Sequence, residues 1–298
     1  MIKTETRILT IDVEEWFHSD MYSDPSTWVH REVRLPDNLD RILELLERRR
    51  VKATFFCLGW VARRHPEQVR KIVAQGHELG CHSDSHRLVH GLEPKTFEQD
   101  TRDALAAIED VSGQRVRAYR APAFSITPAC AWAFEVLCAC GFETDASIFP
   151  AERDFGGWPG FGEARPTIIE TSSGRLHEFP INVVHALGRS LVFSGGGYFR
   201  LVPYRVIRRW TRRSRYVMSY FHPRDFDPRQ PDLPELGAAR RLKSYLGLRG
   251  AFAKFERWLA DFSFVSLGEA AARVDWEACP VIPTGHARAP SLGTTPCG

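Results

Sequence analysis

The sequence predicts an α/β fold with a mostly parallel sheet, on two observations. Short apolar runs rich in β-branched and aromatic residues alternate with segments of helical periodicity along most of the 298 residues. The composition is that of a globular protein, with 43% hydrophobic, 26% charged and 11% aromatic residues, which excludes a collagen, a coiled coil and a mainly disordered chain. A sheet with this many strand–helix units is either open and doubly wound or closed into a barrel.

The first half of the chain contains regular strand–helix units. Apolar runs predict strands at residues 7–13, 53–58, 77–82 and 116–120. Apolar residues at helical spacing predict the helices that follow them, at residues 38–49, 61–75, 96–111 and 128–140. The Thr96-x-x-Gln99 pattern predicts a capping box at the start of the third helix.

The second half alternates less regularly. Further strands are predicted at residues 142–146, 168–170, 177–179, 217–221 and 264–266, and a last long helix at 238–261. A glycine-rich loop at 154–162 interrupts the pattern. Residues 280–298 are rich in Pro, Gly, Thr and Ala and are predicted to form a flexible C-terminal tail, which leaves one domain over residues 1–279.

Charge and cysteine content exclude some partners and indicate a location. The chain has 40 Lys and Arg against 37 Asp and Glu, and this net charge of +3 is too small to require nucleic acid as a partner. No apolar run reaches membrane-spanning length, and the first residues lack the apolar core of a signal peptide. The seven cysteines include no CxxC pair, which fits a reducing compartment. We therefore expect a cytoplasmic protein.

The end of the first strand carries two acidic side chains on one face. Because side chains alternate along a strand, Asp12 and Glu14 share the face opposite Val13, and Glu15 falls on the Val13 side. Two carboxylates on one inner face are unfavourable unless a cation lies between them. The alternative is a solvated strand end.

Two histidines follow the third strand. His82 and His86, in the sequence HSDSH, are four residues apart, a spacing that places both imidazoles on one side of a helical turn. Such a pair also occurs by chance on surface helices. Two histidines and one carboxylate, with open positions for water, form the ligand set of a catalytic zinc-type site, and either Glu14 or Asp12 could complete it.

Three more polar side chains follow predicted strands. Arg120 in RAPAF could hold a buried carboxylate, and a pairing of His222 in YFHPRD with an Asp such as Asp145 in DASIFP is typical of a general acid near neutral pH. Each alone has an ordinary alternative, such as a surface salt bridge or a helix cap. Polar groups at successive strand ends are nevertheless typical of the active sites of α/β barrels.

In this order TIDVE, HSDSH, RAPAF, DASIF and YFHP resemble the five motifs of the polysaccharide deacetylase family, also called the NodB-homology or carbohydrate esterase family 4 domain. The closer resemblance is to the deacetylases associated with exosortase A and exopolysaccharide loci. The resemblance implies a distorted (β/α) barrel over residues 1–279, a divalent metal ion, usually zinc, and hydrolysis of N-acetyl groups on hexosamines of a glycan.

The resemblance also implies roles for individual residues. Asp12 would be the catalytic base, held by Arg120, and His222 the acid that protonates the leaving amine. Asp145 would orient His222, and a backbone N–H near Phe124 would bind the oxyanion. His82 and His86 would be metal ligands.

The sequence departs from the family pattern at three places. Val13 replaces the second of two adjacent aspartates, and because Glu14 faces the same way as Asp12, we predict the ligand set Glu14, His82 and His86. Ser147 stands where the family has a tryptophan. Tyr220 replaces a leucine, so the acetyl pocket is expected to differ in shape.

Two predictions for binding surfaces remain open. Phe124 and Tyr220 are expected to contact the substrate, and Trp158 either stacks on a sugar ring or packs onto the barrel. Residues 205–215 contain six arginines, which form either a solvated helix face or a surface for phosphates of a lipid-linked sugar or of the inner membrane leaflet. Rival functions are a related amidohydrolase acting on a small cyclic or linear amide and a catalytically inactive carbohydrate-binding module.

Overall fold

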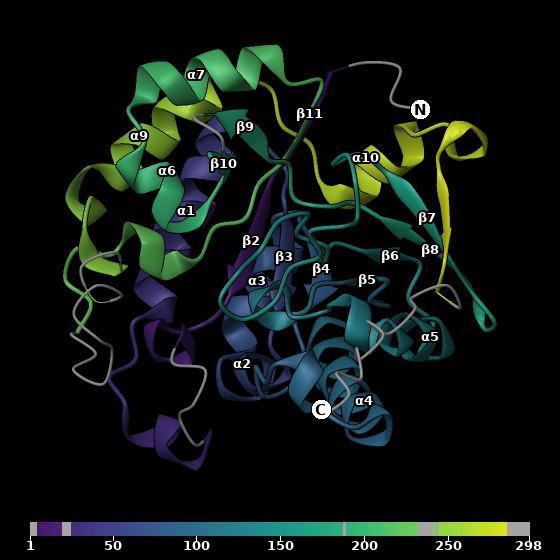
Figure 1. Cartoon of the computed structure of the whole chain (residues 1–298). Coiled ribbons are helices and arrows are strands. Elements are labelled where there is room, and N and C mark those ends of the chain that lie inside the picture. Colours follow the sequence, from purple (N-terminus) through teal and green to yellow (C-terminus); the bar gives the residue numbers. More distant parts are fainter. Residues whose placement is uncertain (1–4, 20–24, 187–188, 232–240, 242–243, 285–298) are drawn as a thin grey trace, which may run out of the picture.

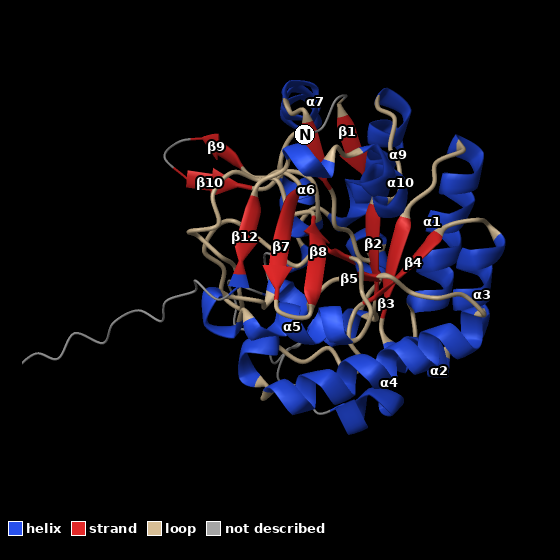
Figure 2. Ribbon diagram, turned by 90° about the vertical axis from the view of Figure 1, so that its right-hand side faces the viewer, coloured by secondary structure: helices blue, strands red, loops and turns tan. Residues whose placement is uncertain are grey.

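The computed structural model describes residues 5–19, 25–186, 189–231, 241 and 244–284 (Figure 1). Most strands lie in the middle of the molecule, and Figure 2 shows helices above, below and to the right of them. The strands are β1 (Thr6–Ile8), β2 (Thr10–Val13), β3 (Thr54–Cys57), β4 (Glu78–Cys81), β5 (Ala118–Tyr119), β6 (Thr144–Asp145), β7 (Thr167–Thr171), β8 (Gly174–Glu178), β9 (Val184–Ala186), β10 (Arg189–Leu191), β11 (Tyr216–Met218) and β12 (Val281–Pro283). The α-helices are α1 (Leu35–Arg49), α2 (Gly59–Arg64), α3 (Pro66–Ala74), α4 (Pro94–Ser112), α5 (Trp132–Ala139), α6 (Gly196–Leu201), α7 (Tyr204–Arg213), α9 (Leu248–Asp261) and α10 (Leu267–Arg273).

The main sheet is mixed but mostly parallel. Its order is β12-β7-β8-β6-β5-β4-β3-β2, and within it the β7–β8 pair is antiparallel. Beyond β2, the parallel pair of β1 and β11 and a bridge between Ile11 and Phe221 continue the strand arrangement. This confirms the predicted α/β fold and is consistent with a distorted barrel.

Side-chain hydrogen bonds join β2 to the segment after β11. The Thr10 N–H donates to Ser219 Oγ at 3.1 Å, and the Thr10 hydroxyl donates to the Ser219 carbonyl oxygen. Both residues are fully buried. Since a buried polar group without a partner costs free energy, these bonds fix the register of the two segments where the barrel closes.

An aromatic cluster fixes the direction of the chain after β11. Phe221 is fully buried, with ring centroids 5.0 Å from Phe199 of α6 and 4.9 Å from Phe255 of α9. Because side chains alternate in an extended segment, Tyr220 and His222 point the opposite way. The packing of one phenylalanine therefore orients two side chains toward the interior of the barrel mouth.

The carboxylate of Glu15 holds the start of α1. Its oxygens accept hydrogen bonds from the backbone N–H groups of Arg34 and Leu35, at 3.0 and 2.9 Å. Burial raises the pKa of Glu15 to about 7, although the hydrogen bonds from these backbone N–H groups favour the ionised carboxylate and lower the pKa. Glu15 thus belongs to the helix start, and the predicted separation of Glu15 from Glu14 is confirmed.

Several helix predictions need correction. Helix α4 begins at Pro94 without a side-chain cap, so the predicted Thr96–Gln99 capping box is wrong. The single helix predicted at 61–75 is two helices, because Pro66 cannot continue the hydrogen bonding of α2. Of the helix predicted at 238–261, residues 238–240 and 242–243 lie outside the described part, and α9 begins at Leu248. Helix α10 and the β9–β10 hairpin had no sequence prediction.

Two predictions near the C-terminus are also wrong. Residues 264–266 form only an isolated bridge through Val265 to Ile8. Residues 281–283, predicted to begin a flexible tail, form β12, which pairs with β7, so the predicted boundary at residue 280 is wrong. Residues 285–298 of that tail lie outside the described residues. Among the described residues, no helix has the length and apolar character needed to cross a membrane.

Replacement of Ser219 by alanine is expected to lower the free energy of unfolding by about 1–3 kcal/mol, because the buried Thr10 N–H loses its acceptor. Urea unfolding measures the change. The control is Ser172→Ala, which removes an exposed hydroxyl bonded to Glu135 and is expected to have a small effect. Equal unfolding midpoints for Ser219→Ala and the wild type would contradict the role of this bond in closing the barrel.

Candidate active site

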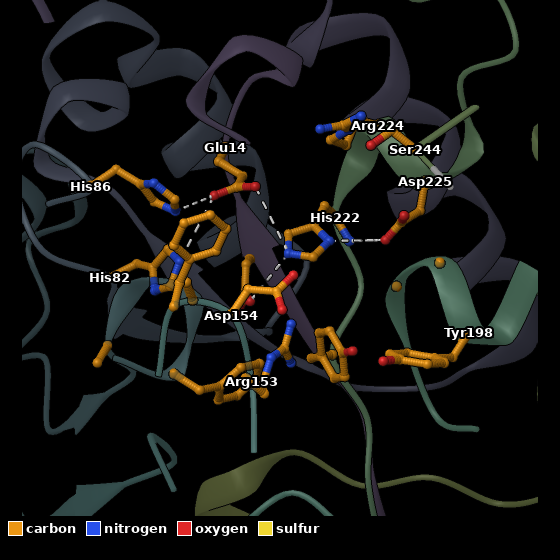
Figure 3. Close-up of a pocket in the computed structure, with 18 of the residues that line it drawn as sticks. Glu14, His82, His86, Arg153, Asp154, Tyr198, His222, Arg224, Asp225 and Ser244 are labelled. Atoms are coloured by element: carbon orange, nitrogen blue, oxygen red, sulfur yellow. Dashed lines mark hydrogen bonds and ion pairs between the residues drawn. The ribbon is translucent and has the colours of Figure 1, made fainter. Parts of the chain in front are cut away.

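A cavity of about 530 Å³ opens where the parallel strands end. Its wall includes side chains that follow β2, β4 and β11, far apart in the sequence. Figure 3 shows Glu14 between the imidazoles of His82 and His86 on one side and that of His222 on the other. The lining includes seven of the ten residues predicted for the site, namely Asp12, Glu14, His82, His86, Phe124, Tyr220 and His222, and not Arg120, Asp145 or Trp158.

Glu14, His82 and His86 form a candidate metal centre. One ligand atom from each lies within 4.8 Å of the others, and all three residues are buried. Glu14 Oε2 is 2.7 Å from His86 Nε2 and 3.9 Å from His82 Nε2. The structure thus brings together the three residues predicted as ligands. The carboxylate of this group comes from Glu14 and not from position 13, which is a valine.

The turn that presents the two histidines is not helical. Ser83 and His86 have left-handed backbone conformations, with φ of 70° and 53°, and Ser83 Oγ accepts a hydrogen bond from the His86 N–H at 3.0 Å. The prediction that a helical turn aligns the imidazoles is therefore wrong, although the pairing itself is right. A left-handed residue is unfavourable for a side chain with a Cβ, so the turn is fixed by its surroundings.

The donor set fits a divalent cation. His82 Nδ1 lies 2.7 Å from the carbonyl oxygen of Arg120, so Nδ1–H donates there and the Nε2 lone pair faces Glu14. This is the arrangement by which a second contact fixes the tautomer of a ligating histidine. Burial lowers the pKa of His82 to about 4, which keeps the imidazole neutral and available as a ligand.

The carboxylate of Glu14 is ionised in these surroundings. Burial alone would raise its pKa, but His86, His222 and His82 together hold the pKa well below its usual range. A cluster of imidazoles around one buried carboxylate is the electrostatic environment that a bound cation would reinforce.

Asp12 is held by a fully buried arginine. Arg120 Nη1 donates to Asp12 Oδ1 at 2.8 Å and to Thr10 Oγ1 at 2.6 Å, and Arg120 Nε donates to the Ala146 carbonyl oxygen at 3.2 Å. The guanidinium also lies 4.3 Å from the centroid of the Phe56 ring. These contacts fix Oδ1, and the other carboxylate oxygen, Oδ2, lies 3.6 Å from His222 Nε2.

Asp225, rather than Asp145, orients His222. Asp225 Oδ2 lies 2.9 Å from His222 Nδ1 and accepts the His222 backbone N–H at 3.0 Å. Burial would lower the pKa of His222, but Glu14, Asp225 and Asp12 outweigh it and raise the pKa to about 9. The imidazole is therefore protonated near neutral pH, and the prediction that Asp145 orients it is wrong.

Asp145 instead supports the segment that carries Arg120. It accepts hydrogen bonds from the Ser147 hydroxyl and N–H, at 2.7 and 2.9 Å, and the Ser147 oxygen accepts the Ala121 N–H at 2.8 Å. Burial and the nearby Asp145 raise the pKa of Glu178 well above its usual range. Asp145 is thus a structural residue next to the site.

The predicted substrate contacts are only partly brought together. Phe124 and Tyr220 line the cavity, with ring centroids 5.0 Å apart. The Phe124 N–H already donates to the Ala121 carbonyl oxygen, and neighbouring Ala123, with φ of 52°, also lines the cavity. Trp158 is not part of the cavity wall, and its ring centroid lies 6.3 Å from that of Phe134 and 6.0 Å from that of Phe161. Of the two predictions for Trp158, the structure therefore favours packing onto the barrel.

Two side chains that line the cavity, Asp225 and Arg153, were not identified from the sequence. Asp225 had a local signal, because it lies three residues after His222 in a short turn that begins with Pro223. Arg153 had none. Its guanidinium lies 4.5 Å from the Phe149 ring centroid and 5.9 Å from that of Tyr220, and it lines the cavity.

Fold and site define the class of protein: an α/β barrel with a candidate Glu–His–His metal centre and an aspartate–histidine pair at the ends of its strands. A family model described as "Polysaccharide deacetylase" matches residues 23–137, and one described as "Domain of unknown function (DUF3473)" matches residues 146–272. The first match contains His82, His86 and Arg120, and the second contains His222 and Asp225.

Two curated relatives illustrate the sequence similarity. The chitooligosaccharide deacetylase of Rhizobium leguminosarum is 31% identical over 90 residues, 29% of this chain and 42% of the relative. The peptidoglycan deacetylase of Helicobacter pylori is 30% identical over 115 residues, 37% of this chain and 36% of the relative. The matched part of this chain thus spans less than half the length of either relative.

Solved structures agree over a longer range. A putative polysaccharide deacetylase from Mycobacterium smegmatis has a TM-score of 0.66 and 20% identity, covering 94% of this chain and 93% of that one. A CE4 family pseudoenzyme from Bacillus anthracis has a TM-score of 0.52 and 16% identity, covering 95% and 71%. These likenesses show the fold. The family model and the curated relatives show that part of this chain is similar in sequence to polysaccharide deacetylases.

The wild-type protein is expected to bind one divalent zinc ion per chain, and Glu14→Gln to weaken that binding at least tenfold, because a ligating charge is lost. Equilibrium dialysis with metal analysis measures both. Glu15→Gln is a matched control, since Glu15 is adjacent in sequence, equally buried and bonded to the start of α1. Zinc binding that survives Glu14→Gln unchanged, or that is lost equally in Glu15→Gln, would contradict the assigned ligand set.

Proposed function

We propose that this protein is a metal-dependent hydrolase that removes N-acetyl groups from N-acetylhexosamine residues of a glycan. One observation carries the proposal. His222 Nε2 lies 3.6 Å from Asp12 Oδ2 and 3.8 Å from Glu14 Oε1, so an acid, a base and a candidate ligand set face one cavity. The names of the curated relatives, chitooligosaccharide deacetylase and peptidoglycan deacetylase, support the substrate class.

Glu14, His82 and His86 would hold the cation. We expect zinc, because two imidazoles and one carboxylate with open positions are a typical ligand set of catalytic zinc sites. When bound, the cation would supply positive charge that acidifies water and polarises the amide carbonyl group.

Asp12 would act as the base. Its Oδ1 is fixed by Arg120, which leaves Oδ2 as the oxygen that accepts a proton from the attacking water. A base held by a buried arginine stays in one orientation during the reaction, which lowers the entropic part of the barrier.

His222 would act as the acid. Once water has added to the carbonyl carbon, the C–N bond breaks and the amine nitrogen takes the proton of His222 Nε2, giving acetate and a free amine. Asp225 holds Nδ1–H, so the proton that leaves is the one on Nε2, which faces Asp12 and the cavity.

The substrate setting belongs to the same proposal. The order of the five motifs, with segments such as HELGCHSDSHRLVH and SGGGYFRLVPY, resembles the exosortase A-associated deacetylases. On this basis we propose a role in exopolysaccharide biosynthesis, on a polysaccharide, an oligosaccharide or a lipid-linked precursor. We propose that the protein works in the cytoplasm, since its seven cysteines include no CxxC pair, which fits a reducing compartment.

Acetate release from chitooligosaccharides tests the function. The zinc-loaded wild type is expected to release acetate, and a chelator is expected to stop the release. Asp12→Asn is expected to lower kcat by about 10²–10⁴-fold, the usual contribution of one acid–base group, while zinc stays bound. A near-normal rate for Asp12→Asn would contradict the role of Asp12.

The same assay separates the rival functions. A wild type that binds chitooligosaccharides with zinc in place but releases no acetate would be an inactive carbohydrate-binding module. Release of product from small cyclic or linear amides, without release from sugars, would identify a related amidohydrolase.

A comparison of two aspartates tests how His222 is oriented. Asp225→Asn is expected to lower kcat by about 10²-fold with little change in KM, because His222 loses the carboxylate that holds Nδ1–H. Asp145→Asn keeps an oxygen for the Ser147 hydroxyl and is expected to lower kcat much less. Steady-state kinetics measures both, and a larger loss in Asp145→Asn would restore the original sequence prediction.

A further inference from the structure

Helix α7 presents an unusual concentration of positive charge. Tyr204–Arg213 has the sequence YRVIRRWTRR, with five arginines and no acidic residue. Ile207 and Thr211 are its buried residues, and the arginines point away from this buried face or to its sides. The whole chain has a net charge of only +3, whereas α7 alone carries five arginines. The positive charge is therefore concentrated on this helix and does not reflect a basic protein overall.

The arginines line a groove rather than a flat surface. A groove of about 320 Å³ lies along α7 and reaches a residue of α9, which is in contact with α7. Figure 1 shows α7 on the outside of the molecule next to α9. The residues of this arginine groove are Tyr204, Arg205, Arg208, Arg209, Arg212, Arg213 and Arg257.

Only part of this charge is neutralised within the protein. Asp261 pairs with Arg208 at 3.0 Å and accepts the Tyr204 hydroxyl at 2.8 Å. Arg257 lies 4.5 Å from the centroid of the Tyr204 ring. The remaining arginines of the groove, Arg205, Arg209, Arg212 and Arg213, have no ion pair with any described residue.

We propose that the arginine groove binds the phosphate groups of an anionic phospholipid surface. Guanidinium groups recognise phosphate through paired hydrogen bonds. Ten helical residues extend about 15 Å, so the arginines along α7 span more than one phosphate and match a layer of headgroups. Leu201, three residues before Tyr204 in the chain, is an exposed apolar residue, with 42% of its surface accessible.

The groove is connected to the candidate active site through α6. Gly196, Tyr198 and Arg200 of α6 line the catalytic cavity, and α7 begins three residues after α6 ends. If α7 binds a lipid surface, the part of the cavity wall formed by α6 is therefore only a few residues away in the chain from the membrane-bound helix. This second site does not depend on the proposed catalytic activity.

Vesicle sedimentation of the full chain tests the proposal. At low salt the wild type is expected to sediment with vesicles of equal parts phosphatidylglycerol and phosphatidylcholine, but not with phosphatidylcholine alone, and high salt is expected to release it. The triple variant Arg205→Gln, Arg209→Gln, Arg212→Gln is expected to bind about 100-fold more weakly, since each basic residue at an anionic surface contributes about fivefold.

A second triple variant controls for net charge. Arg64→Gln, Arg70→Gln and Arg115→Gln remove the same charge from exposed positions outside the groove and are expected to leave binding unchanged. Thermal unfolding checks that both variants fold. A wild type that stays in the supernatant, or an equal loss of binding in both triple variants, would overturn the proposal.

Competition identifies the source of the phosphate. If inorganic pyrophosphate or a short DNA duplex binds the wild type more tightly than the vesicles do, and the α7 variant loses that binding, the groove recognises free phosphate or nucleic acid and the proposal is wrong. Vesicle binding that persists in the presence of both competitors supports a lipid surface.

Discussion

The site depends on the burial of three carboxylates that must each be matched by positive charge. Asp12, Glu14 and Asp225 are 2%, 3% and 4% exposed, and a buried carboxylate without a partner is strongly unfavourable. Arg120 matches Asp12, imidazoles surround Glu14, and His222 and Arg200 match Asp225. Three histidines surround Glu14, and two of them are the other candidate ligands. A cation bound here would further stabilise the buried negative charge of Glu14.

Most of this arrangement follows from local rules in the sequence. Strand alternation alone places Asp12 and Glu14 on one face and Glu15 on the other, and the structure gives Glu15 a separate task at the start of α1. The spacing of His82 and His86 identified the pair but not its geometry. A left-handed turn at Ser83 depends on surrounding contacts, which a pattern of residue types does not contain.

Three further differences from the sequence predictions share one physical reason, which is that a residue or segment had two chemically suitable sets of partners. Asp145 and Asp225 were both chemically suited to hold His222, and the tight turn at Pro223 decided in favour of Asp225. The Trp158 ring was equally suited to stack on a sugar or to pack in the core, and it packs against Phe134 and Phe161. β12 could not be predicted because the composition of its residues is typical of a flexible tail, and the strand forms only by pairing with the edge of β7.

Closure of the barrel connects these parts into one site. The candidate ligands His82 and His86 lie in the segment that matches the deacetylase model, and His222, the proposed acid, lies in the segment that matches the domain of unknown function, so neither segment contains the whole arrangement. Thr10 joins the two segments. Its N–H and its hydroxyl donate hydrogen bonds to Ser219, three residues before His222. Its hydroxyl oxygen also accepts a hydrogen bond from Arg120, which holds Asp12. The distance between Asp12, the proposed base, and His222, the proposed acid, is therefore set by the same contacts that close the fold. A loss of register at Thr10 would separate the two side chains without removing either of them.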